Sequence, residues 1–238
     1  MKRRRISIRL AHFWLVLACG LVPASLAPGQ GTIVYHQPAA PLFGLVGLTL
    51  DLNGDGQVDS QFYSASYIPA SYYATGASGV GTAQLLVTPN AGLDGGSHLV
   101  ALGPDFLIGG TIDESLLWAG QDASNSYGDA TVLGSYIAED AAGSLIPVGY
   151  FYGTTAFMGI HFQIDSEWHY GWVRIRGGTA GLSDDGQQLY LNPPGWILDW
   201  ACDMRPGAPI LAGTVPEPST LSLLLVSGAA FWLVRKRL

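Results

Sequence analysis

At 238 residues, the chain is long enough for one substantial domain once its two ends are set aside. Only Arg174, Arg176 and Arg205 of the 11 basic residues lie in the interior, which holds 17 of the 18 acidic residues and carries a formal net charge of −14. Such an acidic interior disfavours nucleic acid and anionic lipid as partners and favours cations such as calcium. The hydrophobic fraction of 48% is enough for a core and argues against a disordered interior.

The N-terminal segment has the residue order of a secretory signal peptide. Five basic residues within positions 1–9 precede an apolar run at 10–22, and small residues such as Ala24 and Ala27 follow. We therefore predict a signal peptide at residues 1–27 that signal peptidase removes. Cleavage after Ala24 is favoured because a cut after Ala27 would precede Pro28, and a lipidated Cys19 is an alternative that the sequence leaves open.

Short strands separated by glycine and proline turns are predicted for the first half of the interior. β-Branched, aromatic and small residues are abundant there, and lysine is absent between Lys2 and Lys236, so long surface helices are disfavoured. The predicted strands lie at residues 32–35, 45–52, 61–68, 83–88 and 97–102.

An acidic loop between the second and third predicted strands has the spacing of a calcium-binding loop. Calcium prefers six to eight oxygen ligands, and glycine at the sixth position permits the sharp turn that brings them together. The twelfth position is Phe62 where such loops carry a bidentate Glu, and a β-hairpin turn explains the same residues without a metal. The predicted ligands are Asp51, Asn53, Asp55, the backbone carbonyl of Gln57, and Asp59.

The second half of the interior continues the pattern of strands, here with alternating faces. Met158, Ile160, Phe162 and Ile164 share one side of a predicted strand, as expected for a sheet. We predict strands at residues 131–136, 144–152, 155–165, 169–176 and 197–202, and one short helix at 115–120. The predicted fold of residues 28–214 is therefore all-β, an antiparallel β-sandwich similar to a jelly roll, flanked by a signal helix and a short C-terminal transmembrane helix.

Catalytic chemistry has no recognisable motif in this sequence. The histidines lack metal-ligand spacing, and no Gly-x-Ser-x-Gly segment is present. Cys202 remains as a single cysteine after signal removal, and we expect it to be a small buried residue. The sequence therefore predicts a protein that is not an enzyme.

The C-terminal segment combines a proline-rich motif, an apolar run at residues 221–234 and a basic cluster. It resembles the PEP-CTERM sorting signal, which implies an exosortase-type membrane enzyme of Gram-negative bacteria as a partner. Fourteen apolar residues make a helix of about 21 Å, shorter than a hydrocarbon core of roughly 30 Å, and the basic cluster is expected on the cytoplasmic side of the inner membrane. An ordinary membrane anchor is the alternative. The motif residues are Val215, Pro216, Glu217, Pro218, Arg235, Lys236 and Arg237.

The half before the tail also resembles exported domains that accompany such tails. The matching segments lie at residues 159–162, 169–173, 199–201 and 206–210. The resemblance implies a location, at the cell surface or in the extracellular matrix, and it implies no reaction. We therefore expect a surface interaction protein, with glycans as possible partners and calcium as a possible cofactor. The alternative is a secreted hydrolase that uses two interior carboxylates on a polysaccharide. Binding to ice or a mineral surface would need a regular Thr or Ser array, which is not visible.

Overall fold

The computed structural model describes residues 32–43, 47–67, 72–88, 97–120, 132–139, 145–182 and 189–216, and the statements below concern these residues. They belong to one compact unit, Thr32–Leu238. The predicted signal peptide and nearly all of the sorting tail lie outside the described residues. The described fold is all-β with antiparallel sheets and no helix, and one short contact between strands is parallel, joining Leu133 to His98.

Fifteen strands are described, and most of them are short. Glycine-rich turns separate them, as the composition predicts. The strands are β1 (Ile33–His36), β2 (Leu42–Phe43), β3 (Leu48–Leu50), β4 (Ser60–Tyr67), β5 (Tyr72–Gly79), β6 (Gln84–Thr88), β7 (His98–Leu99), β8 (Leu107–Ile108), β9 (Leu117–Ala119), β10 (Val132–Glu139), β11 (Leu145–Val148), β12 (Thr155–Ile164), β13 (Glu167–Leu182), β14 (Leu189–Asp203) and β15 (Ile210–Leu211).

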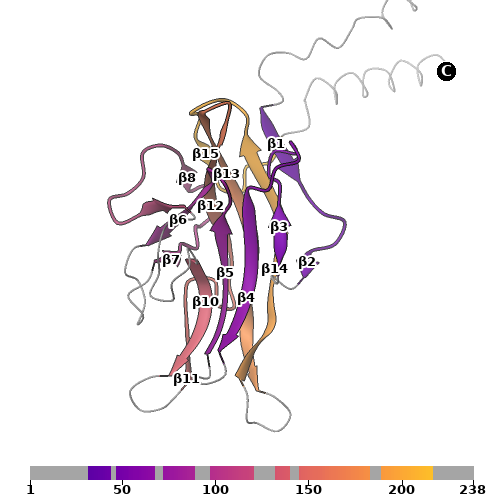
Figure 1. The fold of residues 1–238 in the computed structure, drawn as a ribbon, viewed down its shortest axis with the longest axis vertical. Coiled ribbons are helices and arrows are strands. Elements are labelled where there is room, and N and C mark those ends of the chain that lie inside the picture. The colour runs from indigo at the N-terminus through magenta and orange to yellow at the C-terminus, as the bar shows by residue number, and fades with distance from the viewer. Residues whose placement is uncertain are drawn as a thin grey trace, which may run out of the picture. The chain divides into compact units, whose positions relative to one another are not determined.

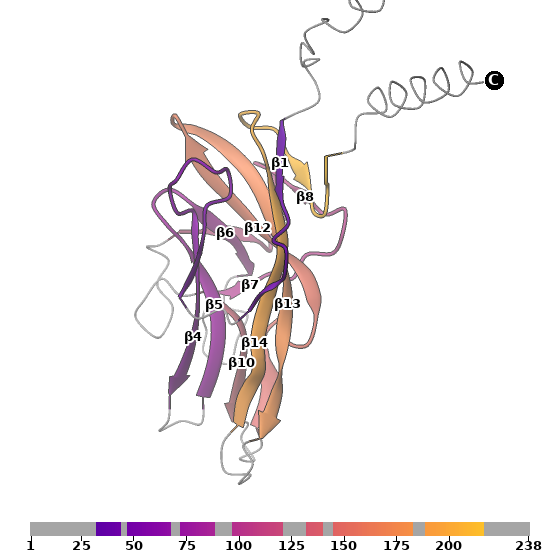
Figure 2. The same ribbon diagram turned by 90° about the vertical axis from the view of Figure 1, so that its right-hand side faces the viewer.

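One continuous sheet contains thirteen of the described strands, and β8 pairs with β15 in a small second sheet. The main sheet runs in the order β1-β14-β13-β12-β6-β7-β10-β5-β4-β3. Figure 2 shows that the sheet turns over on itself: β4 and β5 lie on the left and face β13 and β14 on the right. The same strands overlap in the perpendicular view of Figure 1.

The space between these two layers is filled by an apolar core. Leu50, Leu52 and Phe62 come from the layer with β3 and β4, and residues such as Met158 and Ile175 come from the layer with β12 and β13. All five side chains are at most 4% exposed. Removal of this apolar surface from water is the main force that holds the layers together.

A second core covers the opposite face of β12, β13 and β14. Tyr170 and Trp172 point to this side from β13, whereas Val173 and Ile175 point to the first core, which confirms the predicted alternation. The cover is formed by the segment around Leu102 and Ile108 and by β15. The layer with β12–β14 is therefore packed on both faces over much of its length.

Most of the predicted strands are confirmed, and β13 and β14 are longer than expected. The prediction of a helix at residues 115–120 is wrong, because Leu117–Ala119 forms β9 and pairs with β6. β5 (Tyr72–Gly79) was missed because its small residues carry little strand propensity. β5 is held in an extended conformation by its pairing with both β4 and β10, although its own sequence does not favour a strand.

A bulge explains how two prolines fit within β14. The register joins Gly177 to Gly195 and Thr179 to Asn192, so Pro193 and Pro194 together lie opposite Gly178. Proline cannot donate a hydrogen bond to a neighbouring strand, and a bulge is one of the few places in a sheet that tolerates it. The prolines interrupted the predicted strand, which therefore started only at residue 197.

Candidate functional site

The acidic loop between β3 and β4 is organised by the carboxylate of Asp51. Its Oδ1 accepts hydrogen bonds from the backbone N–H groups of Gly54 at 2.7 Å and Asp55 at 3.2 Å, and its Oδ2 accepts one from Gly56 N at 2.7 Å. Gly54 and Gly56 have φ values of +80° and +87°, a region in which only glycine is unstrained. The loop thus satisfies its own amide groups with its first carboxylate.

Asn53, Asp55 and Gln57 form the exposed tip of this loop. Asn53 Oδ1 accepts from Asp55 N at 3.0 Å, and Asn53 Nδ2 donates to Asp55 Oδ2 at 2.9 Å. Gln57 N donates to Asp55 Oδ1 at 2.7 Å. These contacts are those of successive turns, in which short polar side chains bond to amides two residues away.

Asp59 closes the base of the loop and is the buried member of the predicted ligand set. Its side chain accepts from Leu52 N at 2.8 Å, and the residue is 8% exposed. Burial raises the pKa of Asp59 to about 6, opposed by the hydrogen bond from Leu52 N and assisted by the nearby charges of Asp55 and Asp51.

The fit of the loop to calcium is partial. Its oxygen donors are of the kind that calcium prefers. Among the described residues, however, no three His, Cys, Asp or Glu side chains stand close enough together to hold a metal ion. Phe62, at the twelfth position, is 1% exposed in the first core and supplies no ligand. Turn geometry accounts for the residue pattern, and calcium binding stays a prediction.

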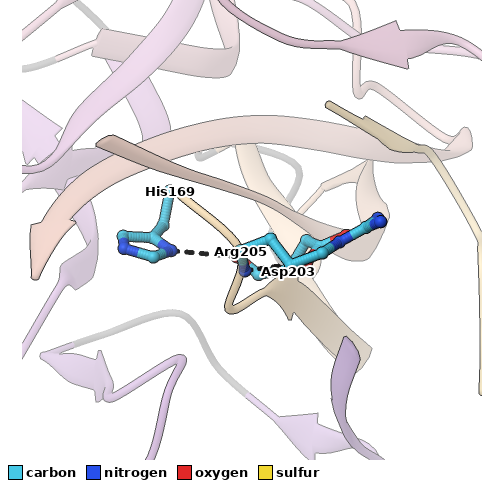
Figure 3. Close-up of polar contacts among 3 residues, drawn as sticks. All are labelled: His169, Asp203 and Arg205. Atoms are coloured by element: carbon cyan, nitrogen blue, oxygen red, sulfur yellow. Dashed lines mark hydrogen bonds and ion pairs between the residues drawn. The ribbon is translucent and has the colours of Figure 1, made fainter. Parts of the chain in front are cut away.

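The segment of β13 that contains His169, Tyr170 and Trp172 has a structural role. Tyr170 is 6% and Trp172 1% exposed, and Trp172 meets Phe157 edge to face at 5.2 Å between centroids. His169 is 3% exposed, and its Nδ1 lies 3.1 Å from the backbone oxygen of Asp203 (Figure 3). Because that oxygen can only accept, Nδ1 is the nitrogen that carries the proton.

Two buried carboxylates on β14 are each paired with an arginine. Asp203 accepts from Arg205 Nη2 at 2.6 Å and from Arg205 N at 2.9 Å, which fixes the turn after the strand (Figure 3). Asp199 forms a two-point ion pair with Arg174, its register partner on β13, and also accepts from the Tyr35 hydroxyl at 2.9 Å. The sequence did not reveal the pair of Arg174 with Asp199, because only the register of β13 with β14 brings these residues together.

Cys202 lies on β14 and packs against the acidic loop. It is completely buried, and its Sγ lies 3.6 Å from Leu52 O. Burial raises the pKa of the Cys202 thiol to about 12, with further contributions from Asp59, Asp203 and Asp51. The thiol therefore stays protonated at neutral pH, and the expectation of a small buried cysteine is confirmed.

A stack of three rings on the outer face of β12 was not anticipated from the sequence. His161 lies between Trp118, at 4.0 Å between centroids, and Trp168, at 4.1 Å, with interplanar angles of 10° and 17°. Its Nε2 lies 2.7 Å from Gln84 Oε1, and its Nδ1 is buried without a partner. The available signal was the alternation of β12 and β13, which places His161 and Trp168 on one face.

Only the first two residues of the predicted sorting motif fall within the described part of the chain. Val215 is 46% exposed, and Pro216 is also exposed. Glu217, Pro218, the apolar run at 221–234 and the basic residues Arg235, Lys236 and Arg237 lie outside it. Within the described residues, no helix has the length and apolar character needed to cross a membrane.

Comparison with known proteins gave no match to any protein-family model, curated protein or solved structure.

Proposed function

We propose that this chain is an exported protein of a Gram-negative cell envelope that reaches the surface through its C-terminal sorting tail. The observation that carries this proposal is the place where the tail leaves the domain. Thr214 N donates to Leu211 O at 3.0 Å, and the next two residues, Val215 and Pro216, are exposed. The described part of the motif, Val215 and Pro216, is therefore accessible to an enzyme.

The proposed route uses two membrane enzymes in succession. Signal peptidase cleaves within the predicted signal segment 1–27, after Ala24, during export. The apolar run at 221–234 then holds the protein in the inner membrane, with the basic residues 235–237 on the cytoplasmic side. Because the run is short for a bilayer, retention is temporary. An exosortase-type enzyme acts at the motif 215–218 and releases the domain to the cell surface or the extracellular matrix.

The exported domain is proposed to act as a non-catalytic interaction module with a β-sandwich fold similar to a jelly roll. The apolar core between the two facing layers supports the sandwich. Among the carboxylates whose burial is described, Asp51, Asp55 and Asp59 belong to the acidic loop, Asp199 and Asp203 pair with Arg174 and Arg205, and the remainder are exposed. A polysaccharide hydrolase needs two facing carboxyl groups at a defined separation, and no observation on the described residues favours that alternative.

The proposal is tested by the mass of the mature protein in a Gram-negative host that contains an exosortase-type enzyme. We expect a product that lacks the signal peptide and the residues beyond the 215–218 motif. Pro218→Ala should retain the C-terminal peptide, and Pro206→Ala, which alters a proline in an exposed turn of the domain, should be processed normally. A mature wild-type protein that keeps its C-terminal peptide would contradict the sorting proposal.

A further inference from the structure

A cavity lies where β12 and β13 extend past the end of β6. Its volume is about 350 Å³, within the range of roughly 300–1,000 Å³ that small-molecule sites occupy. The β5–β6 connection forms one wall, the hairpin of β12 and β13 forms another, and the residue after β9 completes the lining. The lining residues are Gly81, Thr82, Ala83, Gln84, Gly120, Gln163 and Trp168, and we refer to this cavity as the Trp168 pocket.

The lining of the Trp168 pocket is polar and uncharged. Its functional groups are the carboxamides of Gln84 and Gln163, the hydroxyl of Thr82 and the indole of Trp168. The nearest charged residues along the chain, Asp165 and Glu167, are exposed on the hairpin turn and are negative. A phosphate or carboxylate would find no cation among the lining residues, so the chemistry favours a neutral ligand that both donates and accepts hydrogen bonds.

The free hydrogen-bonding capacity of the lining can be assigned atom by atom. Gln84 Oε1 is occupied by His161 Nε2 at 2.7 Å, which leaves the Gln84 NH₂ group as a donor. Thr82 Oγ1 accepts from Gln163 N at 3.1 Å and keeps its hydroxyl hydrogen to donate. The Gln163 carboxamide makes no hydrogen bond to the described residues and offers both a donor and an acceptor. Several groups of both kinds thus surround one small space, as a polyhydroxylated ligand requires.

Trp168 and Gln84 are held in place by His161, which is 6% exposed. One face of His161 stacks on Trp168, and its Nε2–H fixes the Gln84 carboxamide, so a single buried ring orients two lining side chains. The stack also keeps unused capacity: His161 Nδ1, an acceptor, and Trp118 Nε1, a donor, are buried without a hydrogen-bond partner.

We infer that the Trp168 pocket binds one uncharged sugar unit of a glycan. Carboxamides and a threonine hydroxyl match sugar hydroxyls, and an indole provides an apolar surface for the C–H groups of the ring. His161 is a positioning residue that acts through Trp168 and Gln84. The inference deepens the proposed surface role by naming its ligand class, and it rests on that role only for its biological setting, since binding can be measured without export.

The test is isothermal titration calorimetry on the full chain in a polyoxyethylene detergent, which has no sugar headgroup. The probes are glucose, galactose, mannose and N-acetylglucosamine, with glucuronic acid as the charged comparison. We expect at least one neutral sugar to bind with a Kd below about 10 mM and glucuronic acid to bind more weakly than glucose. If no neutral sugar binds, or if the acid binds as well as glucose, the inference is wrong, whatever the tail-processing experiment shows.

Variants separate the pocket from general stability. Gln163→Ala should weaken binding about 5- to 10-fold, the loss of one or two hydrogen bonds, while Gln61→Ala on the exposed side of β4 should leave it unchanged. Trp168→Ala should abolish measurable binding, and if that variant does not fold, Gln163→Ala alone decides.

His161→Phe keeps a ring between the two tryptophans but loses the bond to Gln84. We expect the Tm to be retained and binding to fall several-fold, because Gln84 is no longer oriented. Wild-type affinity in His161→Phe would contradict the positioning role of His161. Wild-type affinity in Gln163→Ala would contradict the binding site itself.

Discussion

The two faces of the layer formed by β12, β13 and β14 differ in chemistry although both are buried. The inner face is mainly apolar, with Met158, Ile160 and Val173 at 0% exposure in the first core, and its buried polar side chain His169 stacks on Phe162. The outer face carries rings and polar groups, including the stack on His161 and the ion pair of Arg174 with Asp199. Alternation along the same strands sends each kind of residue to its own side.

We interpret this difference as a division of roles, in which the inner face stabilises the fold and the outer face contains the proposed binding pocket. Aliphatic side chains pack without directional demands, so the inner face can hold the two layers together. The outer face also carries polar groups that need hydrogen-bond partners, and the Trp168 pocket opens where its cover ends. A second polar feature near the inner side is the acidic loop, which Leu52 anchors in the first core.

The largest expected effect is on the inner face. Ile160→Ala removes a side chain that is 0% exposed and leaves a cavity between the layers, which should lower the free energy of unfolding by about 2–5 kcal/mol. Urea denaturation followed by circular dichroism measures the change. The control is Gln61→Ala, an exposed position expected to stay within about 0.5 kcal/mol of wild type. An Ile160→Ala protein as stable as that control would mean that the layers do not pack as described.

A somewhat smaller loss is expected at the ion pair of the outer face. Asp199→Ala leaves Arg174 and the Tyr35 hydroxyl without their acceptor and should cost about 2–3 kcal/mol, reduced by solvent because the Arg174 side chain is 37% exposed. The double variant Arg174→Ala/Asp199→Ala should lose less than the two single losses combined, since the stranded charge is gone. Additive losses would show that the pair is not coupled.

The pH dependence of stability should carry opposite contributions from the stack and the acidic loop. Burial lowers the pKa of His161 from 6.5 to about 4, so the unfolded chain binds the extra proton and this contribution falls as pH drops from about 6.5 to 4. Burial raises the pKa of Asp59 from 3.8 to about 6, so the folded chain binds the proton there and this contribution falls as pH rises from about 4 to 6.

Single variants separate these two contributions in urea titrations between pH 4 and 7. His161→Phe should remove the part of stability that increases with pH, and Asp59→Asn should remove the part that decreases, because the amide can still accept from Leu52 N. A variant whose stability keeps the wild-type pH profile would exclude the corresponding residue as its source.

The smallest expected effect is that of calcium on the acidic loop. Calcium at about ten times its Kd should stabilise the protein by about 1.4 kcal/mol, which corresponds to a rise in Tm of about 3–6 °C. Asp55→Ala should abolish the rise, and Glu114→Ala, at an exposed acidic position outside the loop, should keep it. A wild-type Tm that is the same with millimolar calcium and with chelator would end the calcium prediction.

Local patterns in the sequence were sufficient for the strands that alternate. The faces of β12 and the two sides of Val173 and Trp172 follow from a period of two, which depends only on backbone geometry. The turns of the acidic loop were equally visible, because glycine and short polar side chains act over two to five residues. The prediction of a helix at 115–120 was wrong because the local sequence of six residues does not determine their conformation. Pairing of Leu117–Ala119 with β6 makes this segment a strand.

What only the tertiary structure decided is which distant residues meet. Arg174 pairs with Asp199 because of the register between β13 and β14. His161 contacts Gln84 and Trp118 because β12 pairs with β6, which in turn pairs with β9. The sequence by itself determined the β-rich character of the domain, its acidic charge and the prediction of its export. The pocket beside Trp168 depends on contacts between segments far apart in the chain, and these are set by burial and strand order, which no local pattern contains.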